Sequence, residues 1–356
     1  MNELQEFHLE SLVPSSQGIW QLSLSVEETQ DMVEQVFLTC HNTVSLQSIR
    51  DEIAKYFRGG VLKIPVLAAR GAEDGSVLVT TAGIHGDEYE GMEAIFRIFD
   101  SLDPAHMRGT FVAVPIATFP AFWMGTRADP WDGLNMARTF PGSSQGSISE
   151  RLAATLLDRV MRHADLYIDL HSGGRNYHML TLCGYVTEGD QASIAAPAAE
   201  CFGAPVIWAH PTVSPGRTLT ATLDAGIPSL YTEGYGGGQA RPQDVDCYAQ
   251  GLANLLKFLE IAELPQAGLP KSYQPLRLHG SGDVDVAMKA SQGGLFFTAL
   301  ELGAKVRKGD LLGVLRSAEG RMLEEVHSPE EGVLVMIRCT PRVFSGELIV
   351  VLSPED

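Results

Sequence analysis

Short runs of apolar and β-branched residues, each followed by a polar loop rich in glycine, constrain the fold of this chain most. Val77–Ala82 is one such run, and its composition suits a strand buried on both faces of a parallel sheet. Apolar residues then recur at helical spacing over Glu90–Leu102, which predicts an amphipathic helix. Ala164–Asp169 predicts another strand, preceded by a helix over Ser149–Arg162. This alternation predicts an α/β fold with a mixed or mostly parallel sheet flanked by helices.

The loops after these two strands carry side chains that bind metals. His85 and Glu88 follow the first strand, within Ala-Gly-Ile-His-Gly-Asp-Glu, and His171 follows the second, within Asp-Leu-His-Ser-Gly-Gly. Because ligands bind outside the carboxyl ends of the strands in open α/β sheets, both segments are expected at one edge. Two imidazoles and a carboxylate are the protein ligands of a catalytic zinc site with one open position. The sequence therefore predicts one Zn²⁺ ion and a metal-dependent hydrolase; the alternative for each histidine is an ordinary hydrogen-bonded core residue.

Two further segments carry groups suited to catalysis. A short predicted strand ends in Glu233 and a run of glycines. A carboxylate beside a metal site is suited to accept a proton from water and to return it to a leaving nitrogen. The loop 125–142 carries Arg127 and Arg138, whose planar guanidinium groups match a carboxylate or a developing oxyanion. The alternative for either arginine is an ion pair with an aspartate of its own loop.

These four motifs, in this order, resemble those of the succinylglutamate desuccinylase/aspartoacylase family, relatives of the zinc carboxypeptidases. The resemblance covers roughly residues 60–260 and implies a zinc-carboxypeptidase-like fold. It implies zinc held by His85, Glu88 and His171. It also implies that Glu233 acts first as general base and then as general acid.

For the loop arginines, the resemblance implies that Arg127 polarises the scissile carbonyl and that Arg138 binds the α-carboxylate of the substrate. The loop departs from the family at one position, because the usual Asn-Leu-Asn-Arg is here Asn135-Met-Ala-Arg138. Ala137 removes one polar contact, so we expect a different substrate preference, and Asn135 is a candidate to replace that contact. Arg217, within Pro-Gly-Arg-Thr-Leu-Thr, is a further candidate for substrate binding.

Together these residues predict a zinc-dependent amidohydrolase that deacylates a small N-acylated amino acid or a related amine. One alternative is a zinc carboxypeptidase that acts on short peptides. Another is a metal-binding relative without enzymatic activity. The sequence leaves open the acyl group, the amine, the metal used in the cell and whether the chain forms a homo-oligomer.

Composition argues against several other partners. The chain has 26 Lys and Arg against 44 Asp and Glu, a net charge of −18, which disfavours a nucleic-acid-binding surface. No apolar run approaches the ~18 residues that suggest a membrane span, and the N-terminal residues lack the pattern of a signal peptide. Five scattered cysteines without a Cys-x-x-Cys pair are expected to be free thiols, so we expect a cytoplasmic protein without membrane partners.

The chain divides into three predicted regions. Residues 1–58 are expected to pack on the main domain, with helices over 26–36 and 45–57. Residues 59–263 form the predicted hydrolase domain. Residues 271–356 contain short β runs punctuated by glycine, which predict a small all-β domain. This last region resembles a biotinyl/lipoyl hammerhead fold, but the corresponding turn has no lysine, so we expect a structural or oligomer-forming role.

Histidines outside these motifs carry no such prediction. They have no partner at metal-ligand spacing. Ordinary core or surface roles are expected for four of them: His178, His210, His279 and His327.

Overall fold

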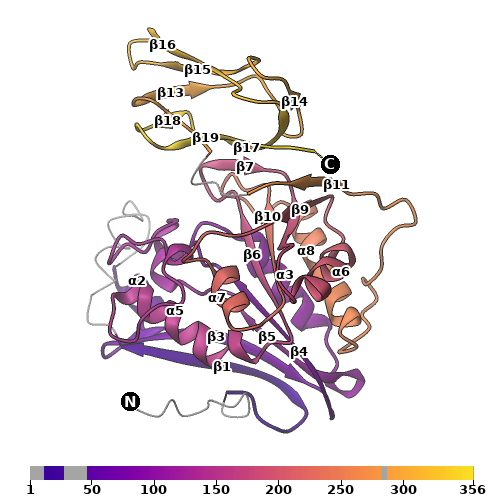
Figure 1. The fold of residues 1–356 in the computed structure, drawn as a ribbon. Helices are drawn as coiled ribbons and strands as arrows, with labels where there is room; N and C mark the ends of the chain where they lie inside the picture. The colour runs from indigo at the N-terminus through magenta and orange to yellow at the C-terminus, as the bar shows by residue number, and fades with distance from the viewer. Residues whose placement is uncertain (1–11, 28–45, 282–286, 356) are drawn as a thin grey trace.

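The computed structural model describes residues 12–27, 46–281 and 287–355, and a mixed sheet of ten strands dominates these ranges (Figure 1). In spatial order the sheet runs β1 (Gly18–Glu27), β3 (Val61–Arg70), β5 (Arg108–Val114), β4 (Glu73–Ala82), β6 (Leu166–Ser172), β10 (Ser229–Gly234), β8 (Leu182–Val186), β9 (Val206–His210) and β11 (Leu276–His279), with β2 (Phe57–Arg58) on β3. The central strands β5, β4, β6 and β10 are parallel neighbours. Their carboxyl ends therefore meet at one edge.

Helices cover both faces of this sheet (Figure 1). One face carries α3 (Glu90–Ser101), α6 (Ala192–Phe202) and α8 (Pro242–Phe258), whose apolar sides share one buried cluster with the strands. The other face carries α4 (Phe119–Met124), α5 (Ile148–Arg159) and α7 (Thr218–Asp224), which contribute to a second cluster. The described ranges also contain the short α2 (Leu46–Ile53) and 3₁₀ turns at Pro104–His106, Met136–Arg138 and Met161–His163. The predicted fold class, a mixed sheet flanked by helices, is confirmed.

Individual elements depart from the predicted bounds in informative ways. Strand β6 continues to Ser172, so His171 lies within a strand and not in the loop after it. The predicted start of the helix over 26–36 is wrong. Val26 and Glu27 belong to β1, where they pair with Leu62 and Val61. The rest of that predicted helix lies outside the described residues. The helix predicted over 45–57 is observed as the shorter α2.

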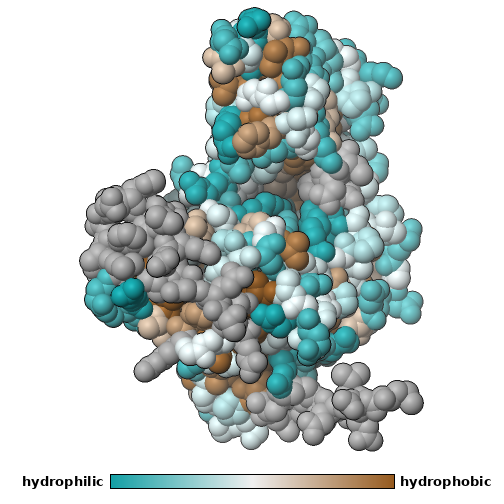
Figure 2. Space-filling model, turned by 90° about the vertical axis from the view of Figure 1, so that its left-hand side faces the viewer, coloured by the Kyte–Doolittle hydropathy of each residue, from teal (hydrophilic) through white to brown (hydrophobic). Residues whose placement is uncertain are grey.

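The C-terminal strands form two small antiparallel sheets that stand apart from the large sheet (Figure 1). In the space-filling view this part is a narrower lobe above the main body (Figure 2). The first contains β12 (Met288–Lys289), β19 (Leu348–Ser353), β17 (Gly332–Arg338) and β14 (Lys305–Val306). The second contains β16 (Met322–His327), β15 (Leu311–Arg316), β13 (Gly294–Phe297) and β18 (Arg342–Val343). A separate apolar cluster fills the space between them.

Two strands connect this all-β part with the large sheet. Strand β7 (Tyr177–Met179) follows β6, the strand that contains His171, and pairs with β17. Strand β11 falls inside the range 271–356, yet it pairs in parallel with β9 of the large sheet. The division of the chain into three domains stays a prediction. No helix within the described ranges is both long and apolar enough to cross a membrane.

Candidate active site

Three of the predicted site residues come together at the carboxyl edge of the central strands. His85 and Glu88 lie in the loop between β4 and α3, and His171 lies in β6; all three are buried. One potential ligand atom from each lies within 4.8 Å of the others. The loop is held tightly, since Gly86 N donates a 2.9 Å hydrogen bond to Thr126 O and a Cβ at Gly86 would lie 1.9 Å from the Ala121 carbonyl carbon.

The contacts of the two imidazoles show that this cluster suits a cation. His85 Nδ1 lies 2.7 Å from Glu88 Oε1, and its Nε2 lies 3.0 Å from Asn135 Oδ1. His171 Nδ1 lies 2.8 Å from Glu88 Oε2, and its Nε2 lies 2.9 Å from Asp169 Oδ2. Every ring nitrogen thus faces an oxygen acceptor, although a neutral imidazole has only one N–H. A metal ion held by both Nδ1 atoms and Glu88 would remove this mismatch, and the two Nε2–H groups would then donate to Asn135 and Asp169.

The charges around the cluster act differently on the two histidines. Burial opposes the charged form of His171, but Asp169 and Glu88 outweigh it and raise the pKa of His171 well above its usual value, so metal binding there would displace a proton. Burial, with Arg127 nearby, lowers the pKa of His85 to about 4, which keeps this imidazole neutral. Burial works against the ionised form of Glu88, but the two histidines outweigh it and hold the pKa of Glu88 below its usual value. A neutral imidazole and an ionised carboxylate are the forms in which these side chains bind metals.

A network of buried hydroxyl groups holds Asp169, the residue behind His171. Asp169 is fully buried. Thr218 Oγ1 donates to its Oδ2 at 2.6 Å, and Thr81 Oγ1 donates to its Oδ1 at 2.7 Å. The Thr81 hydroxyl also lies 2.5 Å from Tyr167 Oη. Burial opposes ionisation, yet His171 and these hydroxyls keep the pKa of Asp169 below its ordinary value.

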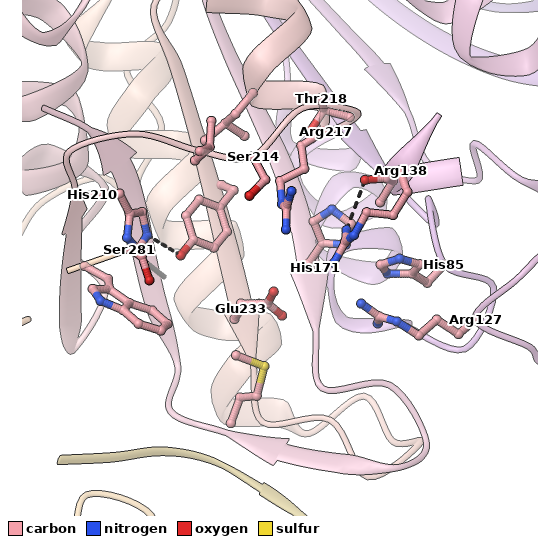
Figure 3. A pocket seen from close by; sticks show the side chains of 16 residues that line it. His85, Arg127, Arg138, His171, His210, Ser214, Arg217, Thr218, Glu233 and Ser281 are labelled. Atoms are coloured by element: carbon pink, nitrogen blue, oxygen red, sulfur yellow. Dashed lines mark hydrogen bonds between the residues drawn. The ribbon is translucent and has the colours of Figure 1, made fainter. Parts of the chain in front are cut away.

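The structure places Glu233 beside the metal-binding cluster. Glu233 on β10 is directly opposite His171 on β6, and Figure 3 shows its carboxyl group in the cavity between His171 and His210. Its Oε2 is buried and has no hydrogen-bond partner among the described residues. Burial raises the pKa of Glu233 to about 8. A carboxyl group in this setting is suited to exchange a proton near neutral pH.

The predicted catalytic Arg127 and the predicted substrate-binding Arg138 and Arg217 line the same cavity, which has a volume of about 100 Å³. Arg127 Nη1 donates to Glu88 Oε1 at 3.0 Å. Arg138 Nη1 donates to the carbonyl of Ala137, and Arg217 is the N-cap residue of α7. The contacts of these arginines with a substrate stay predictions.

Asn135 has a role that the sequence reasoning missed. Its Oδ1 contacts His85 Nε2 and also accepts a 2.9 Å hydrogen bond from Ala137 N. This carbonyl therefore orients a predicted metal ligand, and its predicted contact with substrate stays a prediction. Asp169 was also missed, although it stands two residues before His171, on the same face of the strand.

The all-β part of the chain contributes to the mouth of the site. A neighbouring cavity shares Arg127, Arg138 and Glu233 with the first. Its other side is formed by Lys289 of β12 and by residues of β17 and β19. The approach to Glu233 is therefore bounded from two sides.

Comparisons with known proteins find similar sequences. The model of the succinylglutamate desuccinylase/aspartoacylase catalytic domain matches residues 74–259. An N-alpha-acetyl-L-2,4-diaminobutyric acid deacetylase from Halomonas elongata is 28% identical over 347 residues, which are 96% of this chain and 97% of that protein.

Solved structures with the same fold are also found. The product-bound ectoine utilization protein EutE (DoeB) from Ruegeria pomeroyi superposes with a TM-score of 0.81 at 25% identity, over 96% of this chain and 97% of that chain. A succinylglutamate desuccinylase from Silicibacter sp. TM1040 has the same fold, with a TM-score of 0.81 at 23% identity over 97% of both chains.

Proposed function

The chain belongs to the succinylglutamate desuccinylase/aspartoacylase family, and from this membership we propose that it is a zinc-dependent amidohydrolase. Its proposed substrates are small N-acylated amino acids or related amines, from which it releases a carboxylic acid and a free amine. The name of the Halomonas relative supports this class, since that protein is a deacetylase of an Nα-acetylated amino acid. The observation that carries the proposal is Glu233 Oε2, which is buried beside the His85, Glu88 and His171 cluster and has no hydrogen-bond partner in the described part of the chain.

The proposed ligands of the zinc ion are the Nδ1 atoms of His85 and His171 and the carboxylate of Glu88. When bound, zinc supplies Lewis acidity, which makes water a stronger acid and polarises a carbonyl group. Two imidazoles and one carboxylate are a ligand set typical of zinc hydrolases. Asn135 and Asp169 orient the two imidazoles by accepting from their Nε2–H groups.

Proton transfer is the proposed role of Glu233. Its carboxylate takes a proton from the attacking water and gives it to the amide nitrogen as the C–N bond breaks. A leaving amine needs this proton, because an amide anion is a poor leaving group. The raised pKa of Glu233, about 8, places both protonation states within reach near neutral pH.

The arginines are proposed to stabilise negative charge on the substrate. Attack on the carbonyl carbon develops negative charge on its oxygen, and Arg127 is proposed to stabilise that charge. Its 3.0 Å hydrogen bond to Glu88 Oε1 supports this role, since Glu88 is a proposed metal ligand. Arg138 and Arg217 line the same cavity and are proposed to bind the carboxylate of the amino acid.

A hydrolysis panel followed by mass spectrometry tests the proposal. Zinc-loaded protein is incubated with acetyl, succinyl and longer N-acyl amino acids and with short peptides, with and without a chelator. We expect chelator-sensitive release of a free amine from one N-acyl class. Cleavage of peptides alone would support a carboxypeptidase instead. That result would also mean that the residues on both sides of the approach to Glu233 leave room for a peptide. Hydrolysis that is indifferent to the chelator would contradict the metal-dependent mechanism.

A further inference from the structure

The cavity has a second polar end that the proposed mechanism does not use. Along β10, Tyr231 and Glu233 are two residues apart, so their side chains emerge on the same face of the sheet. Tyr231 is opposite Gly184 of β8, and Gly184 is opposite Trp208 of β9. His210 follows Trp208 by two residues and shares its face. Tyr231, Trp208 and His210 all line the cavity that contains Glu233.

The glycine at position 184 lets the tyrosine ring lie across the sheet. A Cβ at Gly184 would stand 2.0 Å from Tyr231 Cε1 and 2.7 Å from its Oη. With that space open, the Tyr231 ring passes over β8 and its hydroxyl lies 2.7 Å from His210 Nε2 on β9. The rings of Tyr231 and His210 are stacked, with centroids 5.6 Å apart.

The proton positions in this pair follow from the other nitrogen of the imidazole. His210 Nδ1 lies 3.0 Å from the carbonyl oxygen of Gly280, which can only accept a hydrogen bond. Nδ1 therefore carries the proton. Burial lowers the pKa of His210 to about 4, so the ring is neutral and its Nε2 has a lone pair. The Tyr231 hydroxyl must donate to Nε2, which leaves only lone pairs on Tyr231 Oη for any other partner.

This acceptor lies on the far side of Glu233 from the predicted metal ligands. Figure 3 shows His210 and Ser281 on one side of Glu233, and His85 and Arg127 on the other. The strand repeat separates the backbone positions of Tyr231 and Glu233 by about 7 Å, and the Tyr231 hydroxyl extends from there across β8 to His210. The acceptor therefore lies within the same cavity as Glu233 but away from the scissile amide, where the end of an amino-acid side chain would point.

We propose that Tyr231, with His210 and Trp208, forms the subsite for the end of the substrate's side chain, and that this subsite takes a hydrogen-bond donor, an amino or hydroxyl group. The inference rests on the proposed deacylase function and specifies its substrate class. Tyr231 Oη accepts the hydrogen bond from the substrate. The Trp208 indole N–H is directed to His279 O, and its ring lines the cavity, where an aromatic face further favours an ammonium group. A side chain that ends in a carboxylate would face the lone pairs of Tyr231 Oη and would gain no hydrogen bond there.

A series of side chains of similar size tests the subsite. The substrates are the Nα-acetyl derivatives of 2,4-diaminobutyrate, homoserine, norvaline and aspartate, which end in ammonium, hydroxyl, methyl and carboxylate groups. The zinc-loaded protein is expected to show a kcat/KM for at least one donor-bearing substrate about tenfold above that for the norvaline derivative, the effect of one buried hydrogen bond. Comparison of the first two distinguishes an ammonium from a hydroxyl preference. Equal values for the donor and methyl substrates would overturn the subsite and leave the deacylase function standing.

Two variants separate a recognition role from a structural one. Tyr231→Phe removes the acceptor oxygen, so the ratio of donor to norvaline substrate is expected to fall toward one. His210→Phe removes Nε2, the atom that accepts the hydrogen bond from the Tyr231 hydroxyl. The freed hydroxyl can then donate to a carboxylate, and the ratio of aspartate to diaminobutyrate substrate is expected to rise. A Tyr231→Phe protein that melts like the unmodified protein and keeps its donor preference would overturn the proposal.

Calorimetry with the free amino acids supplies a readout that does not depend on turnover. Should none of the four derivatives be hydrolysed, the proposed function fails, and binding of the amino acids decides the subsite separately. Tighter binding of 2,4-diaminobutyrate or homoserine than of norvaline supports the donor-accepting subsite. Equal binding of all three would reject it.

Discussion

Replacement of Asp169 by asparagine changes the charge behind His171 with little change in shape. Asp169 Oδ2 faces His171 Nε2 at 2.9 Å and accepts from Thr218, while its Oδ1 accepts from Thr81. An asparagine can turn its NH₂ group toward Thr81, whose hydroxyl then donates to Tyr167 Oη 2.5 Å away. The hydrogen bonds survive in this orientation, so the variant is expected to fold. The negative charge is lost, which makes His171 a weaker ligand.

The expected effect of Asp169→Asn is a tenfold to hundredfold loss of zinc affinity, or about 1.4 to 2.7 kcal/mol, as found for partners that orient metal-binding histidines. Competition with a chromophoric zinc chelator measures the dissociation constant directly. Thr81→Val is the matched control, because it removes one hydrogen bond to the same carboxylate and leaves the charge in place. Its dissociation constant should stay within about threefold of the unmodified value. An Asp169→Asn protein with unchanged affinity, or a Thr81→Val protein equally weakened, would refute the assigned role of Asp169.

Two further predictions concern stability. The folded protein keeps His210 neutral, with its pKa lowered to about 4, whereas the unfolded chain binds a proton there below ~6.5; acid therefore favours unfolding. Between pH 7 and pH 5 this costs about 2 kcal/mol, so the free energy of unfolding should fall more steeply in the unmodified protein than in His210→Gln, and parallel curves would contradict the buried neutral imidazole. Gly86→Ala places a Cβ 1.9 Å from the Ala121 backbone, so the melting temperature and the metal content should both fall. Gly133 has a positive φ of 73°, unlike Gly86, but a Cβ there has no atom within 4 Å. Gly133→Ala should therefore retain its metal, and equal loss in both variants would show that the clash at Gly86 is not the cause.

Sequence patterns predicted the elements whose signals are local. The apolar runs identified β4 and β6, and the helical spacing of apolar residues identified α3, which the structure ends at Ser101, within one residue of the predicted bound. The ordered motifs identified the family, which the comparisons confirm. The spacing also placed His85, Glu88 and His171 at one edge of the sheet, where the structure brings them together.

Contacts between distant segments were not predictable in this way. Val26 looked helical from its neighbours, but pairing with Leu62 places it in β1. His210 was expected to be an ordinary residue, because its partner Tyr231 lies 21 positions away and meets it only across β8, over Gly184. Asn135 was assigned to substrate, since nothing local to its loop indicates the 3.0 Å contact with His85 Nε2. These interactions depend on the order of strands in the sheet, which no local pattern specifies.

The most direct test of the proposed mechanism is one measurement on Glu233→Gln, its zinc content together with its rate of amide hydrolysis. Glu233 is not among the clustered ligand atoms, and glutamine has nearly the same shape but cannot accept and return a proton. The mechanism predicts one zinc ion per chain, as in the unmodified protein, and loss of turnover by at least about a hundredfold. Undiminished hydrolysis by the zinc-loaded variant would contradict the assignment of Glu233 as the group that carries the proton.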